Sequence, residues 1–312
     1  GSSLTVGAGS LNIFAQSGAT GGNGGTVTVS AGGNLDVAPG SLTAGPQGAN
    51  GKGASFFLTA GSAGAGDLKV GGPLNANGVG TGDGGQITLT NAGTSAFVVN
   101  GGAVANGVNG ALAANAGTTG NGGGVTIINK NSQNIVITNP GDISAAGAGV
   151  GKGGVILVDA GATGPRGAIQ FSNGGTISAA AGAGGGIGGA VSLLASTIST
   201  PANLTVKAAG VGNNAGGSVT LTATGSGLTL DTAAGANRIQ VDAQGGAAGG
   251  DGGTINVNTN GDLTVNTVAA IKMGPQAGNA KGGSLTLNAN LGPAAADLFV
   301  NGALNADGLG NG

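Results

Sequence analysis

A unit of about 32 residues repeats along the whole 312-residue chain. Its clearest segment has an apolar residue, then an alanine two positions later, then a glycine two positions after that. Clear copies begin at Leu74, Ile143, Val206, Val241 and Leu304, and looser copies at Ile13, Leu42, Val104, Ile177 and Met273. Intervals of 29 to 39 residues separate these anchors. A fixed period of this length predicts stacked supersecondary units and not a closed globule.

Each unit holds two further short segments in which apolar residues alternate with others. One follows a glycine pair, as at Val27 and Val29, and the other is a triplet such as Leu35 to Val37. Alternation of this kind, rich in β-branched residues, predicts strands. Three short strands cannot bury their apolar faces alone, so each should pair with its equivalent one turn further on. We therefore expect an all-β fold: a parallel β-helix (β-solenoid) of about ten rungs, with three short strands and a glycine-rich turn per rung.

An antiparallel propeller is the main alternative architecture. Propeller blades usually need four strands and an aromatic signature, whereas this chain offers three strands per unit and has no Trp. No shift in composition marks a domain boundary, so we expect residues 1–312 to form a single continuous array, uncapped at both ends. The glycine-rich tracts, such as 18–25 and 182–189, end in Gly-Gly or Gly-x-Gly directly before a strand. We expect these tracts to be ordered and to stack on one another.

The composition excludes several functional classes. Cys and His are absent, and no Glu occurs, so disulfides, thiol sites and most acid–base pairs are missing. The Asp residues fall at different positions of the unit, which predicts a non-enzyme; a polysaccharide-acting β-helix enzyme is the alternative. A net charge of -2 is too small to attract nucleic acid or an anionic membrane. The charge-free run 177–195 is glycine-rich and keeps the register of the repeat, so we expect no membrane insertion.

Two glycine-rich turns carry an aspartate, at Asp83 and Asp251. They resemble the turns of calcium-binding nonapeptide repeats, in which an aspartate recurs in every turn at a period of about nine residues. Here the aspartate occurs in only two units. We therefore expect no cofactor, and calcium at Asp83 or Asp251 is the alternative that these turns leave open.

The outward face of the longest strand is the candidate binding face. It carries Thr and Asn two residues apart in several units: Thr26, Thr28, Thr88, Thr90, Thr220, Thr222, Thr254, Asn256 and Thr286. Flat Thr arrays on a solenoid resemble ice-binding proteins, and such a face would also suit a glycan. Thr is equally a good strand former whose stacked hydroxyls bond one another. Phe57 and Leu157 interrupt the array.

Two segments carry a resemblance to a known family: Gly217 to Ala223 (GSVTLTA) and Gly141 to Gly147 (GDISAAG). They are similar to segments of large bacterial secreted β-helix proteins, the filamentous-haemagglutinin-like exoproteins and adhesins. The resemblance implies export to the bacterial cell surface and a scaffold or adhesive role, and it supplies no catalytic residues. The units here are longer and less charged than that family's pattern, and no secretion-recognition module is evident.

The leading functional hypothesis is a structural extracellular rod or fibre segment that stacks end to end by strand pairing. The expected partner is a second copy of the chain, in a head-to-tail homopolymer or a lateral bundle, because open strand edges invite strand addition. The residues expected at the two stacking edges are Leu4, Val6 and Ile13 at one end and Leu298, Val300 and Leu304 at the other. A binding module for ice or a glycan is the alternative.

Overall fold

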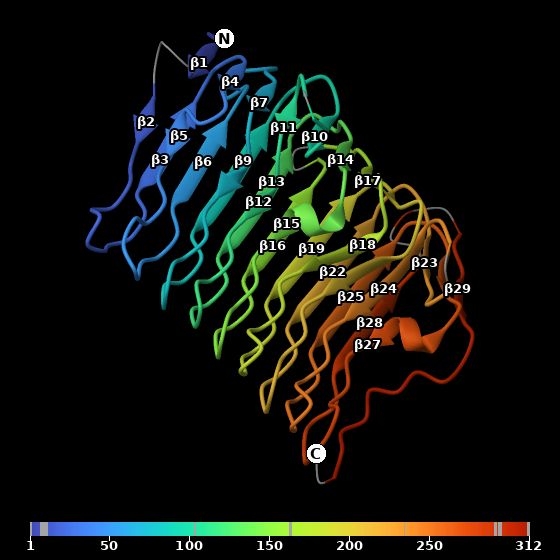
Figure 1. Cartoon of the computed structure of the whole chain (residues 1–312). Helices are drawn as coiled ribbons and strands as arrows, with labels where there is room; N and C mark the ends of the chain where they lie inside the picture. Colours follow the sequence, from blue (N-terminus) through green and yellow to red (C-terminus); the bar gives the residue numbers. More distant parts are fainter. Residues whose placement is uncertain are drawn as a thin grey trace.

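The computed structural model describes residues 2–6, 12–102, 104–161, 164–233, 235–289, 292 and 295–310. They form a β-solenoid of about nine turns with about 31 residues per turn. Figure 1 shows the turns stacked side by side from the N-terminal to the C-terminal end. The predicted fold class, a parallel β-helix, is confirmed. The expectation of ten rungs came from the ten copies of the alanine-containing segment in the sequence. The longest strand occurs nine times in the sheet that it forms.

The longest strands form one unbroken sheet of nine parallel strands, which we call the long wall. All but β6, which follows Gly53-Ala54, follow a glycine pair, and inward apolar residues alternate with outward ones along these strands, as the sequence predicts. Its strands are β3 (Thr26–Ser30), β6 (Ser55–Thr59), β9 (Gln86–Asn91), β13 (Gly124–Asn129), β16 (Val155–Asp159), β19 (Ala190–Ala195), β22 (Ser218–Ala223), β25 (Thr254–Thr259) and β28 (Ser284–Asn288).

The apolar triplets form a second wall, the triplet wall. Its strands are β1 (Leu4–Val6), β4 (Leu35–Val37), β7 (Leu68–Val70), β10 (Phe97–Val99), β14 (Ile135–Ile137), β17 (Ile169–Phe171), β20 (Ile198–Ser199), β23 (Leu228–Leu230), β26 (Leu263–Val265) and β29 (Leu298–Val300). Equivalent residues of neighbouring turns pair in parallel, as Leu35 does with Leu68.

The alanine-containing segments form a third wall, the alanine wall. Its strands are β2 (Ile13–Phe14), β5 (Leu42–Thr43), β8 (Leu74–Asn75), β12 (Leu112–Ala113), β15 (Ile143–Ser144), β18 (Gly175–Ser178), β21 (Leu204–Lys207), β24 (Arg238–Asp242) and β27 (Ile271–Lys272). Short 3-10 helices lead into two of these strands: η1 (Pro140–Asp142) and η2 (Val268–Ala270). The described residues include no helix long and apolar enough to cross a membrane.

The core consists of aliphatic columns that run along the axis between the three walls. In the long wall, Ile87 pairs with Val125 and Leu89 with Ile127, and all four side chains are buried. Burial of such a side chain contributes about 1.5–3 kcal/mol, and each turn places several of them in the core. The alanines of the alanine wall, such as Ala76 and Ala145, are also fully buried. They occupy the narrow corner where the alanine wall approaches the long wall.

Beyond that corner the glycine-rich tracts project from the stack as a thin double layer, which we call the glycine fin (Figure 1). Its two limbs touch directly, because the Gly85 N–H donates to the Ala76 carbonyl at 2.6 Å. A Cβ on Gly85 would lie 1.8 Å from the carbonyl oxygen of Ala54, so only glycine fits there. Successive turns are also joined, as by the Gly53 N–H to the Asp83 carbonyl at 2.9 Å. The expected ordered stacking of these tracts is confirmed.

Two extra layers enter the triplet wall. Strand β11 (Gly107–Val108) lies between β7 and β10 and pairs in parallel with both. In a later turn the first residues of β24, Arg238 and Ile239, pair with β23. Since the rest of β24 pairs with β21 and β27, this strand joins β23, β26 and β29 to the alanine wall as one sheet.

The extra layers correct one detail of the expected repeat. The alanine-wall strand predicted at Val104 is wrong: that strand begins at Leu112, and Val104 lies in the loop before β11. Residues 107–124 hold both β11 and β12. The detour through β11 uses the residues that lengthen this unit. In the later copy predicted at Met273, the strand begins two residues earlier, at Ile271.

Candidate functional site

All nine residues of the predicted binding face lie on the outward side of the long wall. Thr88 occupies one axial column with Thr28, Thr220, Asn256 and Thr286, and each of these pairs with the equivalent residue of the next turn. Thr26 and Thr254 lie in a neighbouring column, and Thr90 and Thr222 lie in a third. The three columns form one outward surface on the long wall. The structure therefore brings the predicted residues onto one face but not into one patch.

Apolar residues divide this face in its central turns. Val155 on β16 is 52% exposed, and Ile128, Leu157 and Leu194 from β13, β16 and β19 are half-buried beside it. They occupy the same columns as the threonines, and Phe57 lies between Thr28 and Thr88, so apolar residues divide the Thr/Asn face both in its central turns and near its N-terminal end. A hydroxyl array that matches a flat lattice needs continuity over many rungs. Ice binding and glycan binding by this face both stay predictions.

The predicted stacking edges lie on strands that pair along one side only. β1 pairs with β4, β2 with β5, and β29 with β26. Leu4 is 37% exposed and Leu298 is 46% exposed, whereas Leu35 and Leu263, in the same columns, are fully buried. Ile13 and Val300 are half-buried, and Leu304 lies in a segment without strand pairing. The side chain of Val6 lies outside the described part of the structure.

The two turn aspartates stabilise the glycine fin. Asp83 Oδ1 accepts a hydrogen bond from the backbone N–H of Asn121 in the next turn at 2.7 Å. Asp251 Oδ1 accepts one from the N–H of Lys281 in the same way, at 2.8 Å. Asn23 and Asn121 make the equivalent bond in other turns. Among the described residues, no three His, Cys, Asp or Glu side chains lie close enough together to hold a metal ion.

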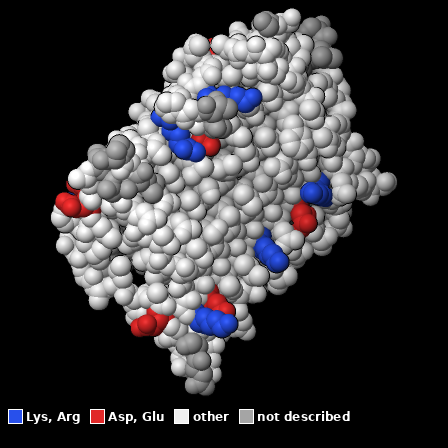
Figure 2. Space-filling model, turned by 180° about the vertical axis from the view of Figure 1, so that it is seen from behind, with Lys and Arg blue, Asp and Glu red and all other residues white. Residues whose placement is uncertain are grey.

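Some of the remaining charges form local ion pairs with a neighbouring residue or turn. Lys69 Nζ lies 2.9 Å from Asp36 Oδ2 in the neighbouring turn, and Arg166 Nε lies 3.1 Å from Asp159 Oδ1. On the face that Figure 2 shows, charged side chains are scattered over an otherwise uncharged surface. Asp262, which precedes a triplet, has a structural role, since its Oδ1 accepts the N–H of Asp297 one turn on. One ion pair borders a hollow: Lys207 Nζ lies 4.0 Å from Asp242 Oδ2, and both residues line a cavity beside β21 and β24.

Asp231, at the end of β23, has the most perturbed carboxyl group. Its oxygens accept hydrogen bonds from the Ala233 N–H at 2.9 Å, the Thr267 hydroxyl at 3.0 Å and the Asn266 amide at 3.2 Å, and from the Arg238 guanidinium. The Ala233 N–H contributes most to lowering the pKa from 3.8 to about 2, although burial opposes it. This carboxylate holds a loop in place.

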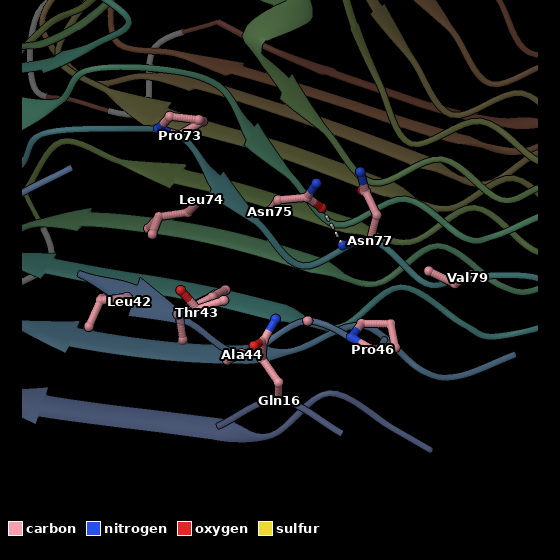
Figure 3. Close-up of a pocket in the computed structure, with 12 residues that line it drawn as sticks. Gln16, Leu42, Thr43, Ala44, Pro46, Pro73, Leu74, Asn75, Asn77 and Val79 are labelled. Atoms are coloured by element: carbon pink, nitrogen blue, oxygen red, sulfur yellow. Dashed lines mark hydrogen bonds between the residues drawn. The ribbon is translucent and has the colours of Figure 1, made fainter. Parts of the chain in front are cut away.

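One candidate site was not predicted from the sequence: an opening in the alanine wall between β5 and β8. It encloses about 270 Å³ and is lined by residues of both strands and of the adjoining fin (Figure 3). The sequence signal that marks it is Gly45-Pro46-Gln47 directly after the alanine-type segment. The same three residues follow β27, as Gly274-Pro275-Gln276.

A scan against protein-family models found no match, and searches of curated proteins and of solved structures found no significantly similar chain. The resemblance to filamentous-haemagglutinin-like exoproteins therefore stays a prediction.

Proposed function

We propose that the chain is a structural rod segment, extracellular in location, whose copies stack end to end by parallel strand pairing. The observation that carries the proposal is the open edge of the last long-wall strand. The Ser284 N–H donates to the Gly253 carbonyl at 2.9 Å, so this peptide group faces β25. Successive peptide groups of a strand alternate in direction. The N–H groups of Leu285 and Leu287 therefore face away from β25, toward any strand that adds there.

The side chains at this edge support the same proposal. Leu285 and Leu287 are half-buried, while Ile255 and Val257, in the same columns one turn earlier, are fully buried. A further turn stacked on β28 would remove the remaining apolar surface from water at about 25 cal/mol per Å². It would also satisfy the free N–H groups. The proposal includes an adhesive role on a bacterial surface, and the family resemblance is the only support for that part.

The test is electron microscopy of the purified chain over a concentration series, with light scattering as a second measurement. Rods that lengthen with concentration are the expected result. Discrete particles of one length at every concentration would contradict end-to-end stacking.

A matched pair of variants locates the joint. Leu287→Lys puts a charge on the inward side of the edge strand, where a stacked turn would bury it at a cost of several kcal/mol. Thr286→Lys puts the same charge on the outward side of the same strand. We expect Leu287→Lys to keep the chain as single rods and Thr286→Lys to leave assembly unchanged, with both variants folded by circular dichroism. Equal assembly of the two variants would rule out this edge.

The alternative, a binding module that uses the Thr/Asn face, gains no support from the divided face described above. Thermal hysteresis measured on wild type and on Thr220→Leu tests its ice-binding form.

A further inference from the structure

The alanine wall is interrupted between β5 and β8. β5 pairs with β2 alone and β8 pairs with β12, and no ladder joins β5 to β8. The long wall is not interrupted at this level. Its strands β6 and β9, which belong to the same two turns, pair from Ser55 opposite Gln86 to Thr59 opposite Thr90. The opening is therefore confined to one wall of the solenoid. Figure 3 shows Leu42 and Thr43 on one side of it and Leu74 and Asn75 on the other.

The sequence keeps this opening from closing by strand pairing. The carbonyls of Ser41 and Thr43 accept bonds from the turn of β2, so the backbone nitrogens of Leu42, Ala44 and residue 46 face β8, while the Ala44 carbonyl accepts the Gly25 N–H. Residue 46 is a proline and offers no N–H there. On the opposite side, Leu74 and Ala76 donate to the turn of β12, so residue 73 faces β5, and it too is a proline. Proline on a facing edge is a known block to strand addition.

Two more residues adapt the edges to the gap. The Asn77 N–H, which would otherwise face β5 unpaired, donates to the side-chain Oδ1 of Asn75 at 2.9 Å (Figure 3). Phe56, at the base of the opening, is the one aromatic side chain in a long-wall column that holds Val27 and Ile87 in the adjacent turns. Its ring is larger than the aliphatic side chains at this position in the neighbouring turns, and it lines the opening.

The lining of the opening indicates the chemistry of a ligand. Its base is apolar, formed by Leu42, Phe56 and Leu74, and its rim carries the amides of Gln16, Asn75 and Asn77 and the hydroxyl of Thr43. No lining residue is charged, so an ion would lose its hydration without compensation. The peptide groups of Leu42 and Asn75 add donors and acceptors that no strand uses. The Oδ1 atoms of Asn75 and Asn77 already accept the N–H groups of Asn77 and Asn115, so these two amides offer mainly their Nδ2 donors. The Gln16 amide, the Thr43 hydroxyl and the free peptide groups both donate and accept, as the hydroxyls of a sugar do.

We propose that the opening between β5 and β8 binds a single neutral sugar residue. The apolar C–H face of the ring lies on Leu42, Phe56 and Leu74, and the ring hydroxyls bond the rim amides and the free peptide groups. The volume of about 270 Å³ suits one small ring, since pockets for drug-sized ligands begin near 300 Å³. This site is separate from the end-to-end joint and from the Thr/Asn face, so it stands or falls independently of the proposed function.

The test is saturation-transfer NMR on the purified chain with methyl glucoside, N-acetylglucosamine and glucuronate as probes. Transfer to at least one neutral sugar and none to glucuronate is the expected result. Transfer to no sugar, or to glucuronate as strongly as to the neutral sugars, would overturn the proposal.

A filled-site variant shows where the sugar binds. Gly45 lines the opening, and a Cβ there meets nothing within 4 Å, so Gly45→Phe fills the site without displacing the backbone. Gly274→Phe is the matched control, because Gly274 also precedes Pro-Gln, has equally open space and lies near the other end of the stack. We expect Gly45→Phe to abolish the transfer and Gly274→Phe to preserve it. Transfer that survives Gly45→Phe would place the sugar elsewhere and refute this site.

A peptide probe separates the proposal from strand addition. The hexapeptide of residues 105–110 contains β11, the segment that this molecule itself inserts between two turns of the triplet wall. Because prolines line both edges of the opening, we expect this peptide neither to bind nor to displace the sugar. Displacement of the sugar by the peptide, or peptide binding in place of sugar binding, would show that the opening is a strand-addition site and that the sugar assignment is wrong.

Discussion

The loops 100–108 and 231–239 leave the triplet wall and return to it in the same way. In the first, β10 pairs with the returning strand so that Val98 lies opposite Gly107; in the second, Thr229 lies opposite Arg238. Both returns therefore span nine residues. The Asn100 N–H donates to the Val108 carbonyl at 2.8 Å, and the Asp231 N–H donates to the Ile239 carbonyl at 3.0 Å. The two loops are copies of one geometry in turns far apart along the stack.

The residue before each returning strand is an asparagine, and in both loops its side chain accepts a backbone hydrogen bond. Asn106 Oδ1 accepts the N–H of Leu68, and Asn237 Oδ1 accepts the N–H of Thr200, each at 3.1 Å and each from the turn below. This bond replaces a ladder hydrogen bond at the point where the extra layer begins. The shared asparagine indicates that the register of the inserted strand depends on a side-chain acceptor at this position.

The loops differ in what holds them closed. In the first, Asn106 is 2% exposed and its amide also donates to the Ser95 carbonyl at 3.0 Å. In the second, Asn237 is exposed, and the buried carboxylate of Asp231 binds Arg238 and three neighbouring donors. The same detour is thus stabilised once by a neutral amide and once by a charge. The difference teaches that the register and the closing contact are independent, and that only the second loop should respond to acid.

Among these predictions, removal of the buried Asn106 amide should lower the free energy of unfolding most. Asn106→Ala leaves the Ser95 carbonyl without its donor and removes one of the two acceptors of the Leu68 N–H, the other being Asn91 Oδ1 at 3.0 Å. The variant loses two hydrogen bonds, each worth about 0.5–1.5 kcal/mol, which together contribute about 1–3 kcal/mol. We expect a loss of unfolding free energy in that range by urea denaturation, with faster hydrogen exchange at Leu68 and Val108.

Asn109→Ala is the matched control for this variant. Asn109 directly follows the first loop, is only half-buried, and its side chain makes no hydrogen bond in the described structure, although its backbone N–H donates to Val70. We expect its stability to stay within about 0.5 kcal/mol of wild type, as surface substitutions usually do. Equal losses in the two variants would show that the buried amide does not hold the first loop.

Neutralising the carboxylate should have a smaller, pH-dependent effect. The pKa of Asp231 is lowered from 3.8 to about 2, chiefly by the Ala233 N–H. A depressed pKa stabilises the fold above the unfolded value, and that contribution disappears as the pH falls from about 4 to about 2. We expect Asp231→Asn to melt below wild type at pH 6 and to converge with it near pH 2, measured by circular dichroism.

The first loop serves as the comparison in the same melting experiment, because residues 100–108 contain no side chain that titrates between pH 2 and 6. Asn106→Ala should therefore remain less stable than wild type across this range. A stability difference for Asp231→Asn that is constant with pH would mean that the ion pair and its neighbours do not depend on the charge.

Most of the regular fold could be predicted from the sequence, since the strand period and the inward columns repeat in every turn. Val27, Ile87 and Val219 fall in one column because glycine pairs precede them at the same distance. The ordered fin could also be predicted, because each glycine tract leads straight into a strand. Periodic burial leaves a periodic sequence, and this is the signal that sequence patterns carry best.

The extra layers and the opening in the alanine wall could not be predicted in this way. β11 has two residues, Gly107 and Val108, too few to show a period, and Val104 imitates the repeat nearby. The opening arises from single residues, Pro46, Pro73 and Phe56, which break the pattern in different walls and meet only in the folded stack. The outward Thr/Asn residues were placed on the right face, but their division by Ile128 and Leu194 depends on register across several turns.

The smallest expected effect comes from backbone conformation and distinguishes the two loops once more. Asn100 and Asn237 adopt positive φ angles of 57° and 55°. This region costs most L-residues roughly 1–2 kcal/mol, and Asn less, while glycine enters it freely. The Asn100 side chain makes no hydrogen bond in the described structure, so Asn100→Gly should gain about 0.5 kcal/mol from relief of this strain. Asn237→Gly gains the same relief but loses the acceptor of the Thr200 N–H, worth about 1 kcal/mol, and should be slightly destabilised. Urea denaturation of both variants measures the difference; if Asn237→Gly were as stable as Asn100→Gly, the shared asparagine would not set the register of the extra layer.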